Sequence, residues 1–274
     1  MPRAYDDALD AALDGLGIAI APRVRSAIEG HVRLLLAWNQ AINLSAVRDP
    51  AGIAVRHVAD SLAALPLLAG RGIDRFVDLG SGGGFPGLTL AAALPADRAL
   101  LLDSIAKKVR FLATTAAATG LADRVAAVSA RAEDLVTRGG EREAWPAVTA
   151  RAVARLPELI ELALPFLRPG GILVAWKRGP ADDPDGLAGE LAEGATALRA
   201  IDPGARIEVV PAAPALRQRL KPEATERHAP SDIADHVLVV VERGHGSLDP
   251  RWPRDPAARR RHPWTATARA AGRC

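Results

Sequence analysis

Strand-like and helix-like patterns alternate through the middle of this chain of 274 residues. Short apolar runs bounded by turn residues predict strands, and the helical spacing of apolar residues between them predicts helices. The predicted strands lie near residues 75–79, 99–103, 124–128, 147–151 and 171–177. Because parallel strands need crossover connections, this alternation predicts an α/β fold with a doubly wound, mostly parallel sheet.

Helical patterns and two late strands flank this region. Helices are predicted at residues 7–16, 22–42, 50–68, 157–167 and 182–200. Two further strands, near 206–210 and 236–241, fit an antiparallel hairpin that brings the sheet to seven strands. We therefore expect an N-terminal helical extension (1–70), an α/β domain (71–242) and a C-terminal tail (243–274).

The turn after the first predicted strand is the most informative part of the sequence. The strand reaches Asp78, and residues 80–85 (Gly-Ser-Gly-Gly-Gly-Phe) contain four glycines before a helical pattern begins. A strand, a glycine-rich turn and a helix start hold nucleotide-like ligands at the edge of parallel sheets. Gly80 and Gly82 match a dinucleotide fingerprint, but Phe85 stands where its third glycine is needed, and the Asp78 carboxylate would repel a pyrophosphate. The turn fits S-adenosylmethionine better, because the sulfonium and ammonium groups of that ligand are positive. The alternative is that the glycine turn binds no ligand and serves only the packing of strand and helix.

Polar residues also follow the next predicted strands. Asp103 ends the second strand, 23 residues after Gly80, where a carboxylate can bind both ribose hydroxyls or can instead cap the next helix. Residues 131–133 follow the third strand, where an adenine can lie. Arg151 and Lys177 end the fourth and fifth strands, at the edge where open α/β sheets bind ligands. The arginine fork suits a phosphate or the edge of a guanine.

Taken together, these motifs resemble the RsmG (GidB) family, over about residues 30 to 265. The motifs are Trp-Asn-Gln-Ala-Ile-Asn-Leu-Ser at 38–45, His-Val-Ala-Asp-Ser-Leu at 57–62, the turn at 78–87, Leu-Asp-Ser at 102–104, Arg-Ala-Glu at 131–133 and Ala-Arg-Ala-Val-Ala at 150–154. Members of this family methylate N7 of a guanine in the decoding region of 16S ribosomal RNA. The resemblance therefore implies a Rossmann-like class I methyltransferase that uses S-adenosylmethionine.

The resemblance also implies roles for individual residues. Gly80 and Phe85 would flank the methionine part of the methyl donor, S-adenosylmethionine, and Arg151 would lie where the substrate and this donor meet. Asp78 and Gly82 of the turn are expected in the same donor site. The remaining donor residues are expected to be Asp103, Ser104 and Ile105 at the ribose, and Ala132 and Glu133 at the adenine.

Three segments depart from the pattern of the family. Pro146-Ala147 stands where many relatives have Phe-Asp, and Trp252-Pro253-Arg254 stands where relatives often have Tyr-Pro-Arg. Residues 138–145 look like a loop insertion. These departures concern the substrate side of the site rather than the donor side.

The implied reaction needs little acid–base chemistry. Guanine N7 carries a lone pair and no proton, so its methylation depends on positioning rather than on a general base. The sequence has no Asn-Pro-Pro-Tyr or Asp-Pro-Pro-Tyr element of the kind used for exocyclic amines. We therefore expect Arg151 to position the substrate and no residue to act as a general base. His57 and Asp60 could form an acid–base pair or could tie a helix to the sheet, and Asn39 could contact RNA or end a helix.

Positive charge is concentrated at the C-terminus. Residues 243–274 contain eight arginines and two aspartates, whereas the whole chain has a net charge of only +3. A basic tail beside an enzyme suits the neutralisation of phosphates, although it could also be a solvated terminus without a partner. The candidate RNA-binding residues are Lys177, Arg251, Arg254, Arg259, Arg260 and Arg261.

Composition excludes several other classes of protein. The only cysteine is Cys274, which excludes internal disulfides and a cysteine-based zinc site, and we expect no metal site. There is no uninterrupted apolar run of about 18 residues and no apolar signal segment at the N-terminus, so we expect a cytoplasmic protein without a membrane partner. A monomer that acts on 16S rRNA or on the small ribosomal subunit is the expected form. The alternatives are an NAD-dependent oxidoreductase, a small-molecule methyltransferase and an RNA-binding module without catalysis.

Overall fold

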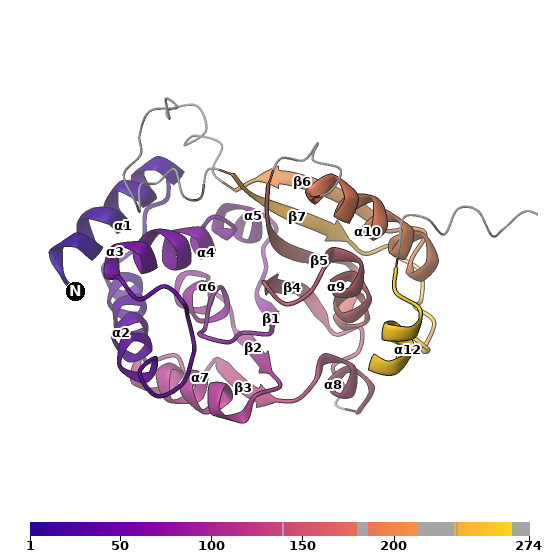
Figure 1. The fold of residues 1–274 in the computed structure, drawn as a ribbon, viewed down its shortest axis with the longest axis horizontal. Coiled ribbons are helices and arrows are strands. Elements are labelled where there is room, and N and C mark those ends of the chain that lie inside the picture. Colours follow the sequence, from indigo (N-terminus) through magenta and orange to yellow (C-terminus); the bar gives the residue numbers. More distant parts are fainter. Residues whose placement is uncertain (139, 180–185, 213–232, 234, 265–274) are drawn as a thin grey trace, which may run out of the picture.

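Seven strands form a single sheet in the order β3-β2-β1-β4-β5-β7-β6 (Figure 1). The computed structural model describes residues 1–138, 140–179, 186–212, 233 and 235–264. The strands are β1 Arg75–Leu79, β2 Arg98–Asp103, β3 Val125–Ser129, β4 Trp145–Arg151, β5 Leu167–Arg178, β6 Arg206–Pro211 and β7 His236–Glu242. β1 to β5 pair in parallel, and β7 pairs antiparallel with both β5 and β6. This topology confirms the predicted seven-stranded, mostly parallel sheet.

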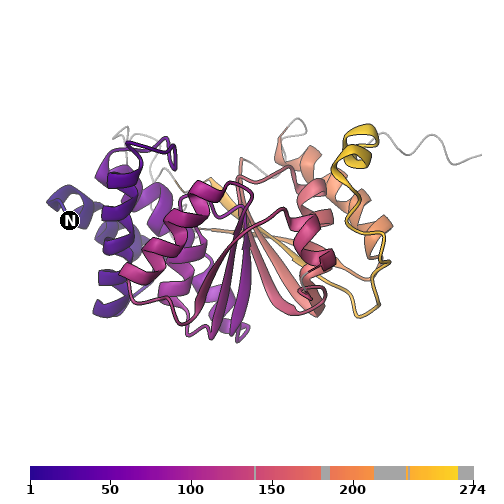
Figure 2. The same ribbon diagram turned by 90° about the horizontal axis from the view of Figure 1, so that it is seen from below.

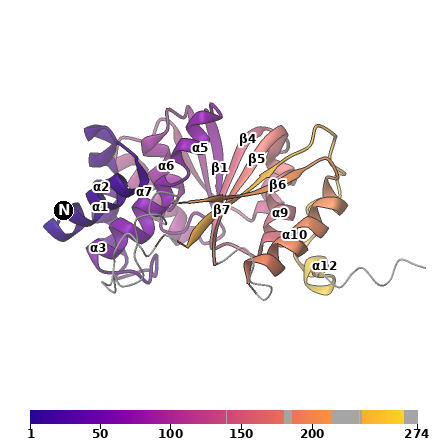
Figure 3. The same ribbon diagram turned by 90° about the horizontal axis from the view of Figure 1, so that it is seen from above.

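Helices cover both faces of the sheet (Figures 2 and 3). One face carries α1 Arg3–Leu16, α2 Pro22–Trp38, α6 Gly87–Ala93 and α7 Ala106–Ala118, whose buried side chains form one apolar cluster with side chains of that face. The other face carries α9 Leu156–Ala163 and α10 Leu187–Ile201, which contribute to a second cluster. The shorter helix α8 Ala132–Arg138 follows β3, and α12 Pro256–Arg261 lies near the C-terminus. Each face of the sheet is therefore buried, as the continuous apolar runs of its strands require.

Two predicted helices differ from the observed ones for local reasons. The second helix ends at Trp38 because the side chain of Asn39 organises the following loop: its Oδ1 accepts from the backbone N–H groups of Leu44 and Ser45 at 2.8 and 3.1 Å. Asn39 is therefore a helix-ending residue. The helix after β4 ends at Ala163 and passes through a 3₁₀ turn, η2 Leu164–Phe166, directly into β5. The start of the helix predicted at 182–200 lies outside the described residues.

The third N-terminal helical stretch is continuous from Pro50 to Gly70. It consists of α3 Pro50–Ile53, the π-helical turn η1 Ala54–Ala59, α4 Asp60–Leu62 and α5 Leu65–Gly70. By length and composition it is apolar enough to cross a membrane, but 61% of its most apolar window is buried within the protein. That burial is typical of a core helix. The π-helical turn contains His57 and precedes Asp60, so this irregular turn aims both side chains toward the end of β4.

The described part of the basic tail, residues 243–264, is packed on the fold; we call it the C-terminal arm. Its anchor is Glu161 of α9, a carboxylate with no exposed side-chain surface. Glu161 accepts from the backbone N, Nε and Nη2 of Arg254 at 2.8, 2.9 and 2.6 Å, and from Nε1 of Trp264 at 2.8 Å. Trp252 is buried in the second apolar cluster. Up to Trp264, the arm is therefore part of the folded protein rather than a solvated terminus.

Candidate active site

The glycine-rich turn lies at the carboxyl end of β1, where the strand order reverses between β1 and β4. Gly80 and Gly82 have φ values of +63° and +51°, in the left-handed region that favours glycine. A Cβ on Gly80 would lie 2.7 Å from a methyl group of Val153, so this position has no room for a side chain. A Cβ on Gly82 would meet only the Gly80 carbonyl oxygen, at 3.7 Å. Glycine at 80 is therefore required by the packing of Val153 as well as by its positive φ, whereas Gly82 leaves open space beside the turn.

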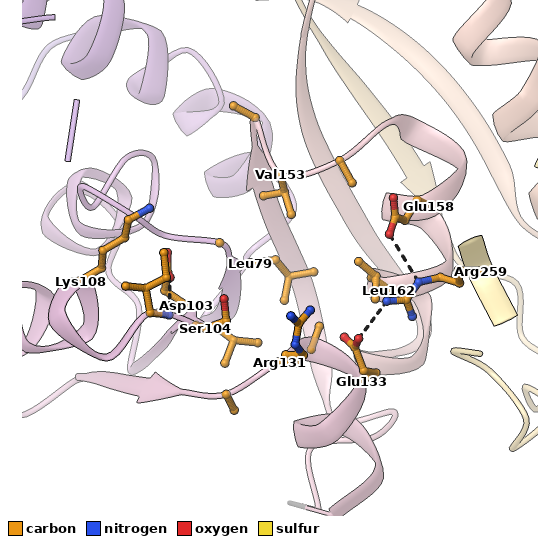
Figure 4. Close-up of a pocket in the computed structure, with 17 residues that line it drawn as sticks. Leu79, Asp103, Ser104, Lys108, Arg131, Glu133, Val153, Glu158, Leu162 and Arg259 are labelled. Carbon is orange, nitrogen blue, oxygen red and sulfur yellow. Dashed lines mark hydrogen bonds and ion pairs between the residues drawn. The ribbon is translucent and has the colours of Figure 1, made fainter. Parts of the chain in front are cut away.

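A first cavity of about 410 Å³ lies beside this turn, along the ends of β1, β2, β3 and β4 (Figure 4). It brings together six of the predicted donor residues, namely Gly80, Asp103, Ser104, Ile105, Ala132 and Glu133. Ile105 and Val153, the large apolar side chains that are exposed in the described part of the chain (42% and 37%), both line it. Exposed apolar side chains beside a polar cleft are typical of a binding site for an amphipathic ligand.

Asp103 connects the turn to the end of β2. Its Oδ2 accepts from the backbone N–H of Gly82 at 3.0 Å, and its Oδ1 accepts from that of Ile105 at 2.9 Å. The residue before α7 is Ile105, so Asp103 is not the cap of that helix. A carboxylate can accept about four hydrogen bonds, so each oxygen of Asp103 can accept one more. Asp103 can therefore bind two hydroxyl groups while it holds the turn.

Asp78 lies behind the turn and lines neither the first cavity nor the second cavity described below. It is fully buried, and its Oδ1 accepts from the Thr149 hydroxyl at 2.7 Å. Its Oδ2 lies against Gly87, where an added Cβ would approach it to 2.5 Å. Because side chains alternate along a strand, Asp78 faces α6, opposite to Val77 and Leu79 of the second cluster. Burial raises the pKa of Asp78 to about 6.

This buried carboxyl makes stability depend on pH in a defined direction. The folded-state pKa of about 6 lies above the ordinary aspartate value of 3.8, so the folded protein binds the proton more tightly than the unfolded chain. The stability that the protonated carboxyl contributes is complete below about pH 4 and is lost as the pH rises through 6. Asp78→Asn should therefore stabilise the protein by about 2–3 kcal/mol at pH 7.5 relative to its effect at pH 4.

Urea unfolding of both proteins at the two pH values measures this difference. Asp97→Asn, at an exposed aspartate, is the control for a general effect of charge. A difference in stability between wild type and Asp78→Asn that does not change with pH would contradict the prediction.

A second cavity of about 430 Å³ lies on the other side of the turn. It is bordered by the loop at 44–47, the π-helical turn, and the ends of β4, β5 and β7. Gly80 and Ala152 line both cavities, so the two spaces meet at these residues. Ala152 has a φ of +57°, a conformation that side chains other than glycine seldom adopt and that is frequent at functional sites.

Arg151 lies in the second cavity with a fixed orientation. Its Nη1 donates to Asp60 Oδ2 at 2.9 Å and to the Arg56 carbonyl oxygen at 3.1 Å. Its guanidinium carbon lies 5.7 Å from the centre of the Phe85 ring. Phe85 also borders this cavity rather than the first one, and stacks on His57 with 4.9 Å between ring centres. The planar guanidinium of Arg151 is therefore held in the second cavity, and the next residue in the chain, Ala152, lies at the junction with the first cavity.

Asp60 is the residue that holds Arg151, and it is almost completely buried. Its Oδ1 accepts from His236 Nδ1 at 2.7 Å, and Arg178 Nε donates to His236 Nε2 at 2.9 Å. Burial alone would raise the pKa of Asp60, but the hydrogen bond from His236 and the charge of Arg151 outweigh burial and keep that pKa below its usual range. Asp60 therefore remains an anion that fixes the cation beside it.

His57 is not paired with Asp60 as an acid–base unit. Its Nε2 lies 2.6 Å from the Ser45 hydroxyl, and burial together with the charge of Arg151 lowers its pKa to about 4. The imidazole is therefore neutral near pH 7 and packs as a polar wall of the cavity. The sequence gives no sign that His236 and Arg178 are site residues, because the motif around Asp60 carries no information about its partners on distant strands.

The candidate RNA-binding cations differ in their surroundings. Lys177 is bonded to Glu190 Oε1 at 2.5 Å and to the Ala154 carbonyl oxygen at 3.1 Å, and Arg254 is committed to Glu161. Arg259 is directed to the first cavity. The cations that project to solvent are Arg251, Arg260 and Arg261. Within the described residues, no group of three or more histidine, cysteine, aspartate or glutamate side chains is placed to hold a metal ion.

Comparisons with known proteins found relatives of this chain. The family described as "rRNA small subunit methyltransferase G" (GidB) matches residues 25–185. The protein named Ribosomal RNA small subunit methyltransferase G from Geobacillus kaustophilus is 38% identical over 186 residues, which are 68% of this chain and 75% of that protein. Its namesake from Sorangium cellulosum is 40% identical over 192 residues, again 68% and 75% of the two chains.

Solved structures show similarity in fold. An O-methyltransferase from Bacillus cereus in complex with SAH superposes with a TM-score of 0.52 at 18% identity, over 78% of this chain and 90% of the other. The O-methyltransferase TomG from Streptomyces achromogenes, in complex with SAM, gives a TM-score of 0.50 at 19% identity, over 82% and 92% of the two chains. The chain thus has the Rossmann-like fold of class I methyltransferases.

Proposed function

The chain belongs to the rRNA small subunit methyltransferase G family, and we propose that it transfers the methyl group of S-adenosylmethionine to N7 of a guanine in 16S rRNA. The observation that carries this proposal is the junction of two cavities at Gly80 and Ala152. The first cavity has the features of a donor site, and the second presents the fixed guanidinium of Arg151. Methyl transfer requires this arrangement, because the methyl donor and the methyl acceptor must lie in line on opposite sides of the methyl group.

The first cavity fits the donor in three ways. Asp103 retains acceptor capacity for the ribose hydroxyls, and Ile105 offers an exposed apolar surface to a flat base. Gly80 borders the cavity with its backbone, so the methionine part could pass close to the turn, whereas Gly82 lines only the second cavity. The methyl group would then point toward the second cavity. When bound, S-adenosylmethionine supplies a carbon that its sulfonium already activates.

The second cavity suits an acceptor that needs no proton removed. His57 is a weak base, because its pKa is lowered to about 4, and Asp60 is fully engaged with Arg151 and His236. A guanine presents N7 and O6 on one edge. Since N7 must face the methyl group, we propose that Arg151 donates to O6 or to an adjacent phosphate. Phe85 and His57 stack on each other and provide the aromatic wall against which the base would lie.

The substrate is proposed to be 16S rRNA, either free or in the small ribosomal subunit. Arg251, Arg260 and Arg261 of the C-terminal arm are the solvent-facing cations proposed to contact its phosphates. An enzyme with this substrate would work in the cytoplasm, and we propose that it acts as a monomer.

Asp103→Ala should weaken the binding of S-adenosylhomocysteine by about 1–3 kcal/mol, because the variant cannot form hydrogen bonds between a carboxylate and the ribose. Isothermal titration calorimetry measures this difference. Asp123→Ala, at an exposed aspartate that follows α7, is the matched control and should not change the affinity. An Asp103→Ala protein that binds as tightly as wild type would assign Asp103 solely to holding the turn.

The proposed reaction is tested directly with purified protein. Tritiated methyl groups from S-adenosylmethionine should enter 16S rRNA, and the labelled nucleoside should co-migrate with 7-methylguanosine after digestion. Label in a different nucleoside would contradict the assignment of N7, and label in neither free rRNA nor the subunit would contradict the proposed substrate.

A further inference from the structure

Arg259 connects the C-terminal arm to the first cavity. It lies on α12, which begins after Asp255; Asp255 Oδ1 accepts from the backbone N–H groups of Ala257 and Ala258 at 2.8 and 2.9 Å. This cap orients the short helix, and the anchoring of Arg254 on Glu161 fixes the chain before it. Figure 4 shows the guanidinium of Arg259 between Glu133 and Glu158 at one end of the cavity.

The hydrogen bonds and ion pairs of Arg259 immobilise its guanidinium. Nη2 donates to Glu133 Oε1 at 2.9 Å, Nε lies 3.4 Å from Glu158 Oε1, and Nη1 donates to the Arg254 carbonyl oxygen at 2.6 Å. The side chains of Arg259 and Glu133 are only 9% and 12% exposed. Groups on α8, α9 and the arm therefore hold the guanidinium of Arg259. The Arg259–Glu133 pair is nearly buried, unlike the exposed arginines that follow it in the chain.

The cavity itself indicates what this end receives. Asp103 marks the ribose position, and the side toward Gly80 and Ala152 opens into the second cavity. The base of the donor must therefore extend the other way, toward Ala132 and Glu133. A glutamate there can accept a hydrogen bond from an exocyclic amine, which adenine has and hypoxanthine lacks.

We propose that Arg259 is a positioning residue for adenine recognition: it holds Oε1 of Glu133 so that Oε2 accepts from the adenine amine. The C-terminal arm is then the wall that closes the adenine end of the donor site, and it contributes to the choice of base. This inference rests on the proposed function, because it takes an adenosyl donor as the occupant of the first cavity.

The test compares two ligands that differ only at the base. S-Adenosylhomocysteine carries a 6-amino group, and S-inosylhomocysteine carries a 6-oxo group that would face the carboxylate oxygen. Wild type should bind the adenosyl ligand about 10- to 100-fold more tightly, the range expected when one hydrogen bond is missing and the buried carboxylate oxygen stays unsatisfied. Calorimetry on the full chain measures both affinities.

Arg259→Met should weaken the binding of S-adenosylhomocysteine at least about five-fold and reduce the preference between the two ligands to about three-fold or less. Glu133→Gln, which should fold without a change in shape, should shift the preference toward S-inosylhomocysteine, because an amide can donate to the 6-oxo group. Arg261→Met, at an exposed position on the same helix, is the matched control and should behave as wild type.

The following outcomes would overturn the inference. Arg259→Met with wild-type affinity would do so, as would a variant in which both ligands bind more weakly by the same factor. If Glu133→Gln loses the preference for S-adenosylhomocysteine and Arg259→Met keeps it, adenine is recognised by Glu133 without help from the C-terminal arm. Failure of the wild type to bind either ligand would instead contradict the proposed function, and the inference with it.

Discussion

Arg151→Lys should lower the single-turnover rate of methyl transfer by about 100-fold or more, because small errors in the placement of reacting groups have effects of this size. Lysine keeps the charge that Asp60 requires but lacks the planar fork, in which Nη1 bonds to Asp60 and the Arg56 carbonyl oxygen while the second nitrogen can face a substrate group. The affinity for S-adenosylhomocysteine should change only a few-fold, since the guanidinium lies in the second cavity. A fall in rate without a comparable fall in donor binding is the expected signature of a substrate-positioning residue.

The control for this prediction is Arg168→Lys, at an exposed arginine that lines neither cavity. Circular dichroism and thermal unfolding establish that both variants are folded. If Arg151→Lys methylates rRNA at the wild-type rate, Arg151 does not position the substrate. Lys177, at the end of β5, would then be the next candidate, although its ammonium is bonded to Glu190.

Arg254→Ala should reduce the free energy of unfolding by about 3–5 kcal/mol, the usual effect of leaving a buried charge without its partner. The Glu161 side chain has no exposed surface and receives three hydrogen bonds from Arg254. The backbone bond and that from Trp264 remain in the variant, but the countercharge is absent. The guanidinium also lies 4.6 Å from the centre of the Trp264 ring, so its removal exposes apolar surface of the arm.

Urea unfolding measures this effect, and Arg251→Ala is the matched control on the same arm. The Arg251 and Asp249 side chains are 66% and 50% exposed, so breaking their ion pair should cost about 0–1 kcal/mol. Equal stability of the two variants would contradict the conclusion that the arm is anchored through Glu161.

The fold was predictable because its signals are local. Strands such as β1 are short apolar runs between turn residues, and the observed bounds Arg75–Leu79 coincide with the predicted ones. The glycine turn was predictable for the same reason, since each positive φ is a requirement of a few adjacent residues. Asp103 was expected at the sheet edge from its place at the end of β2, because parallel strands present their carboxyl ends at one edge. Ser104 and Ile105 were expected there only from the resemblance to the family.

The rest of the site depends on interactions between distant segments. Asp60 meets Arg151 and His236 across 91 and 176 residues, and no local pattern encodes such pairs. The same holds for the arm: its net charge favoured RNA binding, yet Arg254 bonds to Glu161 93 residues away. Asp78 illustrates a different error. It was assigned to the donor by its place in the motif, whereas the alternation of side chains along β1 places it on the opposite side of the turn.

The central claim is that this chain forms 7-methylguanosine in 16S rRNA, and nucleoside analysis of cellular rRNA tests it most directly. 16S rRNA from cells that lack the gene for this chain should contain less 7-methylguanosine than 16S rRNA from the parent strain. Expression of the wild-type chain should restore the nucleoside, and expression of Arg151→Lys should not. An unchanged content of 7-methylguanosine in the cells that lack the gene would contradict the account.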